Sequence, residues 1–261
     1  MTSPLRVGII GPGTLGTALD RHLSAQPRAV EIVGFLARKT GVRHRGTAPC
    51  YTTLSDLLAQ HPTVIVECAG QAALAQYGRE ILGAGVHLVP ASVGALVDDG
   101  LRRSLLDAAM ANHSQLRLPS GAIAGIDGLA AARHGGVDKV LYRGTMSPAS
   151  LQRYVDEPLP EQGLVFSGPA RVAVSKFPKN ANLTGTIALA GIGFDETQVE
   201  MHTDPTVDSN IHELIVQGDF GHFHVKVSGR RISDTSSTSR IVAGSLAEAA
   251  LGSAFLNLSN T

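Results

Sequence analysis

The feature that most constrains this chain is a glycine-spaced turn between a short apolar strand and an amphipathic helix. Residues 5–10 read LRVGII, residues 11–16 read GPGTLG, and apolar side chains recur at roughly helical spacing in the segment that follows. Parallel strands cannot be joined by a tight hairpin and need a crossover, which is usually a helix. The start of the chain therefore predicts a sheet of parallel strands.

The same alternation continues as far as Pro119. Short apolar runs indicate further strands, and longer amphipathic runs indicate helices. We expect strands at 30–37, 63–70, 86–92 and 114–120, and helices at 54–60, 72–85 and 98–113. Ser55 is the expected N-cap of the first of these helices. Strands that alternate with helices predict an open, doubly wound α/β sheet, complete by Pro119.

Beyond Pro119 the strands follow one another more closely, which predicts a smaller α/β domain with a mixed or antiparallel sheet. We expect strands at 138–146, 170–177, 197–204, 211–221 and 222–229, and helices at 182–193 and 240–258. The expected domains are residues 1–118 for the doubly wound sheet, residues 119–235 for substrate and catalysis, and residues 236–261 for a C-terminal helix that returns to the first domain.

Charge and composition favour a small-molecule ligand. Lys plus Arg and Asp plus Glu each number 22, so no field of one sign would attract nucleic acid or an anionic membrane. Because the N-terminal segment has neither a basic region nor a long apolar stretch, we expect a cytoplasmic protein that does not span a membrane. Cys50 and Cys68 have no CxxC spacing, which fits a reducing compartment and argues against structural zinc.

Gly11, Gly13 and Gly16 form the GxGxxG spacing of a dinucleotide-binding turn. In such a turn the first glycine permits the bend, the second lets a pyrophosphate approach the backbone, and the third lets the helix pack against the strand. The anion rests on the helix N-terminus, which free N–H groups make favourable. The alternative is a glycine-rich turn without a ligand, but the strand–turn–helix context favours a dinucleotide.

The segment FLARK at residues 35–39 bears on which dinucleotide is bound. A site for NAD usually ends its second strand with Asp or Glu, which holds the ribose 2′-hydroxyl. This chain has Arg38 and Lys39 there. They could pair with the 2′-phosphate of NADP, and two solvated cations are the alternative. We expect both NAD and NADP to be used, which makes hydride transfer the natural chemistry.

Three of the ten histidines, His212, His222 and His224, lie close together. The run QGDFG between them predicts a turn that joins two antiparallel strands. After the turn, His222, His224 and Lys226 alternate with apolar residues and so share the polar face of a strand. We expect no metal there, because no carboxylate or cysteine stands at a matching spacing. His212 alone could be a structural residue or a proton-transfer group.

Seven features together resemble the L-aspartate dehydrogenase family. Besides the glycine turn they are VIVECAG, VPASVGAL, LPSGAIAGIDGL, FPKNANLTGTIALAGIGFD, SNIHELIVQGDFG and the Thr238-Ser239 pair. Their order and spacing cover nearly the whole chain. The resemblance implies an N-terminal Rossmann domain that binds NAD(P), a middle α/β domain with substrate contacts, and a homodimer. It also implies oxidative deamination of L-aspartate to iminoaspartate for pyridine-nucleotide synthesis.

Residue roles follow from the same resemblance. His212 matches the catalytic histidine, and Asn182 and Ala122 match residues that contact the cofactor; Asn182 could also cap the helix that follows it. Relatives often carry an Arg-Lys-Pro-Pro run where this chain reads YRGTMSPASLQRY, a difference that could change how a substrate carboxylate is held. The remaining candidate cations, each with a surface salt bridge or a solvated role as the alternative, are Lys176, Lys179, Arg143 and Arg240.

Two other functions share parts of this pattern. A Rossmann-fold reductase of another amino acid, imine or semialdehyde would have the same first 119 residues, and only the pairing of Asn182 with His212 argues against it. A redox sensor or scaffold that binds NAD(P) without turnover is the alternative from another class. Glu67, at the end of an apolar strand, could touch cofactor or substrate, or make only local hydrogen bonds.

Overall fold

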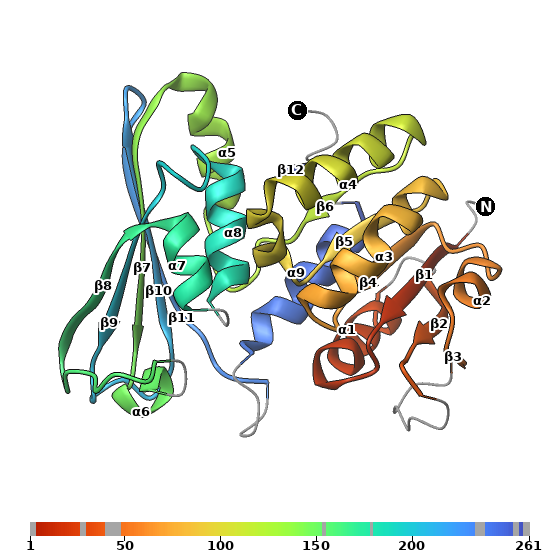
Figure 1. Cartoon of the computed structure of the whole chain (residues 1–261), viewed down its shortest axis with the longest axis horizontal. Coiled ribbons are helices and arrows are strands. Elements are labelled where there is room, and N and C mark those ends of the chain that lie inside the picture. The colour runs from red at the N-terminus through yellow and green to blue at the C-terminus, as the bar shows by residue number, and fades with distance from the viewer. Residues whose placement is uncertain are drawn as a thin grey trace. The chain divides into compact units, whose positions relative to one another are not determined.

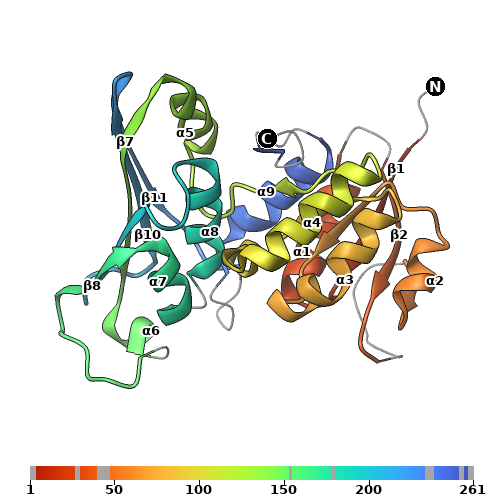
Figure 2. The same cartoon turned by 45° about the horizontal axis from the view of Figure 1, so that its top comes forward.

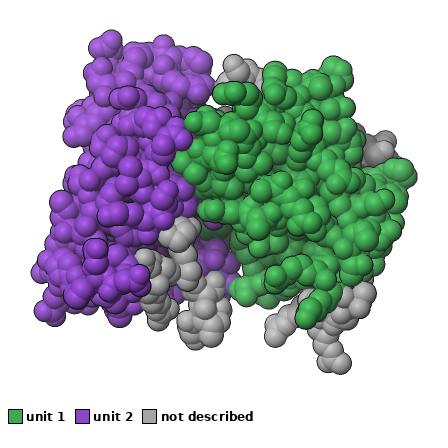
Figure 3. Space-filling model, in the orientation of Figure 1, with its two compact units in different colours: residues 1–119, 242–261 green, residues 120–241 purple. Residues whose placement is uncertain are grey.

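The structure is a computed structural model and describes residues 4–26, 30–39, 48–152, 155–177, 180–232, 238–252 and 256–257. The chain divides into two compact units, which we call unit 1 and unit 2 (Figure 3). Unit 1 comprises residues 1–119 and 242–261, and unit 2 comprises residues 120–241. The boundaries expected from the sequence were 118 and 235.

Unit 1 contains a parallel sheet with the strand order β3-β2-β1-β4-β5. Its strands are β1 Leu5–Ile10, β2 Val30–Leu36, β3 Cys50–Tyr51, β4 Val64–Glu67 and β5 His87–Pro90. All four residues of β4 are buried. Because the sheet is covered on both faces, its strands appear in the sequence as continuous apolar runs.

Helices lie on both faces of this parallel sheet (Figures 1 and 2). Leu19 of α1 and Leu246 of α9 belong to one buried cluster with Val7 of β1. On the other face, a Cβ at Gly78 of α3 would lie 3.4 Å from Leu88 of β5. The helices of unit 1 are α1 Thr14–Ser24, α2 Leu54–Leu58, α3 Gln71–Gly83, the 3-10 helix η1 Val93–Val97, α4 Asp99–Ala111 and α9 Arg240–Ala250.

Unit 2 contains a mixed sheet with the strand order β11-β10-β7-β9-β8. Strands β7 and β9 run parallel, and the other neighbours run antiparallel. The strands are β7 Val137–Met146, β8 Gly163–Pro169, β9 Gln198–Thr203, β10 Ile211–Gly218 and β11 Gly221–Ser228. The predicted fold class, a doubly wound parallel sheet with a smaller mixed-sheet domain, is therefore confirmed.

The longer helices of unit 2 all lie on one face of its sheet (Figures 1 and 2). They are α5 Ile126–Ala132, α7 Ala170–Lys176 and α8 Ala181–Ala190, and the unit also has α6 Pro148–Leu151 and the 3-10 helix η2 Arg133–Gly135. Among the described residues, no helix covers the opposite face. We call that opposite face the open face.

Several expected elements are wrong. Residues 170–176 form helix α7 rather than a strand, because Ala170, Ala173 and Val174 are buried at helical spacing. The N-cap of α2 is Thr53, whose side chain accepts a hydrogen bond from the Asp56 amide, and not Ser55, which lies inside the helix.

The ends of unit 1 also differ from expectation. Strand β6, Arg117–Leu118, pairs with β12, Leu256–Asn257, in a separate antiparallel ladder. Among the described residues, β6 is joined to the parallel sheet by a single bridge, between Leu88 and Leu116. The last helix ends at Ala250 and not near residue 258, and Gly252 follows it with a φ of +87°. Within the described residues, no helix is long and apolar enough to cross a membrane.

Candidate functional site

The glycine turn joins the end of β1 to the start of α1. Gly11 has a φ of +96°, which favours glycine, and its amide donates to the Leu36 carbonyl at 3.0 Å. A Cβ at Gly16 would lie 2.1 Å from the Gly11 carbonyl oxygen, so the helix can approach the strand only with glycine there. Gly13 is exposed, and nothing lies within 4 Å of where its Cβ would be.

The start of α1 fits the pyrophosphate of a dinucleotide. No side chain caps this helix end, and its first turn contains no acidic residue. Its free N–H groups therefore meet no competing negative charge from the helix itself. With the open space beside Gly13, this gives an anion a place to rest on the backbone.

Arg38 and Lys39 come two and three residues after β2 ends at Leu36. Since the Leu36 carbonyl bonds the Gly11 amide, the end of β2 lies beside the glycine turn. Both cations are exposed, and neither forms an ion pair with a described residue. Their charges are thus available to a phosphate at this edge of the sheet.

Glu67, at the end of β4, is fully buried and holds two loops of unit 1 together. Its Oε1 accepts hydrogen bonds from the amides of Ala69 at 2.6 Å and Gly70 at 2.7 Å, and Oε2 accepts from the amide of Ser92 at 3.1 Å. Burial raises the pKa of the Glu67 carboxyl, and these donors act in the opposite direction. The sequence left two roles open for Glu67: contact with cofactor or substrate, or local hydrogen bonds only. Its contacts with the described residues are local hydrogen bonds.

His212 lies in β10 of unit 2, on the face of the sheet that the helices cover. His212 is only 7% exposed, and its Nδ1 is 2.9 Å from the hydroxyl of the buried Tyr142 in β7. Burial lowers the pKa of His212 to about 4. The imidazole is therefore neutral at neutral pH, and its Nε2 has no hydrogen-bond partner among the described residues.

The first residues of α8 approach the same group. Asn180 is buried beside the sheet, with its Nδ2 3.6 Å from Met201 Sδ, and its side chain hydrogen-bonds to the Tyr142 hydroxyl. Asn182 is two residues further along the chain and half-buried. Ala122, also half-buried, follows Gly121, whose Cβ would lie 3.8 Å from Leu183. The structure thus brings the Ala122 loop and the Asn182 helix together within unit 2.

The open face of unit 2 carries His222, His224 and one of the candidate cations, Arg143. His224 Nε2 lies 3.0 Å from Glu213 Oε1, and Arg143 pairs with Glu200 at 2.7 Å. His222 is exposed on the same face. The prediction that β11 has one polar and one apolar face, and that QGDFG joins antiparallel strands, is confirmed. The described residues contain no cluster of metal-binding side chains.

None of the candidate cations is placed against His212 by a described contact. Arg143 neighbours Tyr142 and Gly144 in β7 and therefore points to the opposite face of the sheet. Lys176 Nζ lies 5.6 Å from the Phe166 ring centre, and Arg240 Nε donates to the Arg231 carbonyl. Lys179 is outside the described residues.

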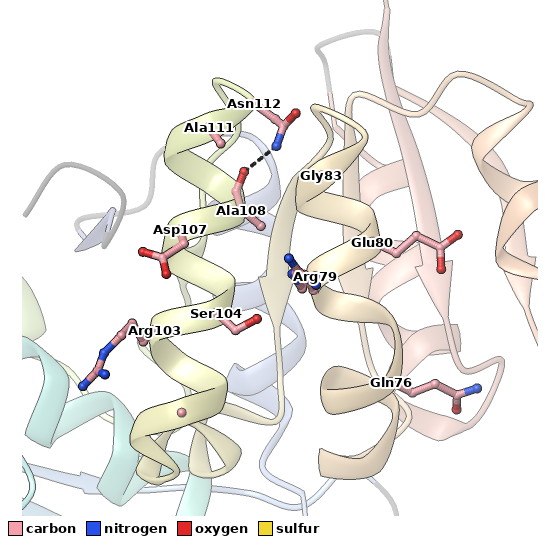
Figure 4. A pocket seen from close by; sticks show the side chains of 11 residues that line it. Gln76, Arg79, Glu80, Gly83, Arg103, Ser104, Asp107, Ala108, Ala111 and Asn112 are labelled. Atoms are coloured by element: carbon pink, nitrogen blue, oxygen red, sulfur yellow. Dashed lines mark hydrogen bonds between the residues drawn. The ribbon is translucent and has the colours of Figure 1, made fainter.

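A groove of about 840 Å³ lies between α3 and α4 of unit 1 (Figure 4). Arg79 and Glu80 of α3 and Arg103 and Asp107 of α4 are among its lining residues. None of the residues predicted from the sequence to bind cofactor or substrate lines it. It lies on helices and not at the ends of the strands, where open α/β sheets bind their ligands.

Comparison with known proteins shows the class of protein to which the two units belong. Residues 11–119 match the family described as homoserine dehydrogenase, NAD binding domain, and residues 127–253 match the family described as aspartate dehydrogenase, C-terminal. With the parallel sheet and the glycine turn, these matches define a two-domain NAD-binding dehydrogenase.

The particular family follows from whole-chain relatives. The chain is 66% identical over 259 residues to L-aspartate dehydrogenase 1 of Bordetella parapertussis, covering 99% of this chain and 100% of the relative. It is 36% identical over 256 residues to L-aspartate dehydrogenase of Serratia proteamaculans, covering 94% and 95%. The chain belongs to the L-aspartate dehydrogenase family, which confirms the resemblance found in the sequence.

Solved structures agree on the fold. Aspartate dehydrogenase from Thermotoga maritima is similar with a TM-score of 0.74, at 24% identity, over 96% of this chain and 95% of that one. A dipicolinate-bound dihydrodipicolinate reductase from Paenisporosarcina gives a TM-score of 0.60 at 13% identity, over 99% of each chain. At these identities the likeness speaks for the fold alone.

Sequence reasoning missed Tyr142, which the structure places next to His212, and Asn180, which acts on the Tyr142 hydroxyl. Both lay within segments of interest, the strand 138–146 and the KNAN run. The register of β7 against β10 brings Tyr142 to His212, and pairing register cannot be read from either strand alone. The signal that could have pointed to them is the alternation of Val140, Tyr142 and Gly144 on one strand face.

Proposed function

We propose that this chain is an NAD(P)-dependent L-aspartate dehydrogenase that oxidises L-aspartate to iminoaspartate. Iminoaspartate would then be hydrolysed to oxaloacetate and ammonia or be consumed in pyridine-nucleotide synthesis. The observation that carries the proposal is the buried, neutral imidazole of His212, with Nδ1 bonded and Nε2 without a partner among the described residues, in a chain of this family. A neutral imidazole can accept a proton at neutral pH.

The cofactor is proposed to bind through Gly11, Gly13, Gly16 and Arg38 of unit 1. The glycines present the N-terminus of α1 to the pyrophosphate, and Arg38 faces the ribose that carries the 2′-phosphate in NADP. Ala122 and Asn182 are proposed as further cofactor contacts, as the family resemblance implies. When bound, the nicotinamide supplies the acceptor for the hydride that leaves the α-carbon of the substrate.

His212 is proposed to handle the protons of the reaction. Its Nε2 takes a proton from the substrate ammonium, which frees the nitrogen lone pair needed to form the imine as hydride departs. In the hydrolytic branch the same atom can take a proton from the water that attacks the imine. In the reverse direction His212 returns the proton during reductive amination of oxaloacetate.

A spectrophotometric assay of NAD(P)H formation tests this proposal. L-Aspartate should give turnover with NAD and with NADP, and oxaloacetate plus ammonia should give the reverse reaction. Glutamate, alanine, malate and homoserine serve as controls. Turnover of one of these in place of aspartate would point to the related reductases, and cofactor binding without any turnover would point to a sensor or scaffold. Either result refutes the proposal.

We also propose a cytoplasmic homodimer that binds neither nucleic acid nor membranes. The balanced net charge supports the absence of polyanionic partners. The open face of unit 2 supports the dimer, because it combines paired charges with the apolar side chains of Leu141, Ile211 and Ile215. Glu213 on the same face is only 8% exposed. Two copies of such a face can pair by a twofold axis, which places the same surface on both sides of the interface.

A further inference from the structure

The hydrogen bond between Tyr142 and His212 crosses from one strand to the next on the face covered by helices. In the β7–β10 pairing, Tyr142 lies opposite Leu214 and His212 lies opposite Gly144. The two side chains are therefore diagonal neighbours, which long aromatic side chains can bridge. Their ring centres are 6.0 Å apart, and Oη lies 2.9 Å from Nδ1.

Gly144 leaves the space that this diagonal contact needs. A Cβ there would lie 3.0 Å from both Tyr142 Oη and Met201 Sδ, and 3.1 Å from Met201 Cε. Contacts this short would force the hydroxyl or the thioether to move. The absence of a side chain at Gly144 thus lets the Tyr142 hydroxyl reach the ring of His212.

Asn180 lies at the start of α8 and acts on the Tyr142 hydroxyl. Its buried side chain favours the charged form of Tyr142 as a hydrogen-bond donor would, which lowers the pKa of Tyr142 against the larger effect of burial. Burial raises the pKa of Tyr142 far above the working range, so the hydroxyl keeps its proton. The hydroxyl oxygen has lone pairs that can accept a hydrogen bond from Nδ1–H, and the neutral imidazole then carries its proton on Nδ1 and keeps a basic Nε2.

We propose that Tyr142 is a positioning residue for His212: its hydroxyl occupies Nδ1, orients the ring and leaves Nε2 as the nitrogen that exchanges a proton with the substrate. Gly144 and Asn180 keep that hydroxyl in place. The inference rests on the proposed role of His212. A hydrogen-bond partner at one ring nitrogen fixes the tautomer of the imidazole and the direction in which the other nitrogen points. Water cannot supply such a partner to a buried histidine.

The decisive variant is Tyr142→Phe, which removes one hydroxyl and keeps the ring. We expect kcat for aspartate oxidation to fall by roughly 10-fold or more, with KM changed less than about twofold, the usual pattern when an orienting residue is lost. Tyr77→Phe is the matched control, because the Tyr77 hydroxyl makes no hydrogen bond to a described residue. It should retain full activity.

The ring itself gives a readout that does not depend on turnover. Nitrogen-15 NMR of labelled histidines, with His212 assigned by comparison with His212→Gln, reports which ring nitrogen carries the proton. In the native protein the tautomer with its proton on Nδ1 should dominate, and in Tyr142→Phe the two tautomers should become mixed. A one-sided tautomer in a protein that does not oxidise aspartate would leave this inference standing and refute only the proposed function.

Gly144→Ala provides a second route, and it keeps the test decisive if Tyr142→Phe fails to fold. It should lower kcat and mix the tautomers while Tyr142 is still present. Gly135→Ala is its control, since a Cβ there meets only Phe220 at 3.8 Å. Unchanged kcat and an unchanged tautomer ratio in the folded Tyr142→Phe protein would overturn the proposal. The same result in Gly144→Ala would overturn the role of Gly144.

Discussion

At the scale of single residues, the burial of His212 couples its protonation to folding. Its pKa of about 4 lies below the 6.5 of an exposed histidine. Between these values the unfolded chain binds a proton that the folded chain does not, so the free energy of unfolding falls as the pH drops from 6.5 to 4. The loss from this one group is up to about 3 kcal/mol.

His212→Gln should remove that part of the pH dependence. We expect the native protein to lose more stability than the variant between pH 7 and pH 4.5, as measured by urea unfolding at both pH values. Well above pH 6.5 the histidine is neutral in both states and contributes no slope. The pKa of His87 is also lowered by burial and by nearby Arg117, and this background is common to both proteins. Equal losses would contradict the burial argument.

Arg38 carries the prediction about cofactor choice. Arg38→Asp replaces a cation with an acid that repels a 2′-phosphate and suits a ribose hydroxyl. The KM for NADP should rise roughly 10-fold or more while the KM for NAD changes little, because a charge-assisted phosphate contact is lost only with NADP. Steady-state kinetics with both cofactors measure this. Arg79→Asp makes the same charge change on α3 as a control, and equal effects on both cofactors would refute the phosphate contact.

At the scale of elements, Glu67 joins the loop after β4 to the residues after β5. In Glu67→Gln only the side-chain oxygen can still accept a hydrogen bond. The side-chain NH2 group therefore faces at least one of the three backbone N–H donors, which loses its acceptor. The free energy of unfolding should fall by about 1–3 kcal/mol, the cost of leaving a buried polar group unsatisfied. Thermal melting measures the loss. Glu80→Gln on the exposed side of α3 is the control, and matching melting temperatures would show that the loops hold without the carboxylate.

Helices and strands whose apolar residues follow one clear spacing were predictable from the sequence, and short elements were not. Strands β1, β2, β4 and β5 of unit 1 are continuous apolar runs, and β10 and β11 alternate, so both kinds are predictable. The prediction of a strand at residues 170–177 is wrong because ARVAVSK, which forms helix α7, fits both periods over seven residues. Strands β3 and β8 were missed, because neither has a long run of one pattern.

The candidate site shows the same limit. His212 and the glycine turn could be found because each lies in a local motif. Tyr142 reaches His212 through strand register, and Asn180 reaches Tyr142 through helix packing, both of which depend on the whole fold. Thr53 and not Ser55 caps α2 because the helix begins at Leu54, as predicted, and Ser55 therefore lies inside its first turn.

At the scale of the whole molecule, the proposed homodimer can be tested by mass. Light scattering after size-exclusion chromatography should give about twice the chain mass of 27.2 kDa. Ile215→Lys, in the middle of the open face, should shift the mass toward one chain by placing a charge in the interface. Met110→Lys is the control, since Met110 is 59% exposed on α4 of unit 1. A single-chain mass for the native protein would refute the dimer.

Unit 1 is built from both ends of the chain, because Leu246, Ala247, Ala249 and Ala250 of α9 share a buried cluster with Val7 and Ile9 of β1. During synthesis, β1 is made before unit 2 and α9 is made after it. One apolar face of the parallel sheet therefore stays uncovered while unit 2 is synthesised, and the core of unit 1 is complete only once α9 has been made.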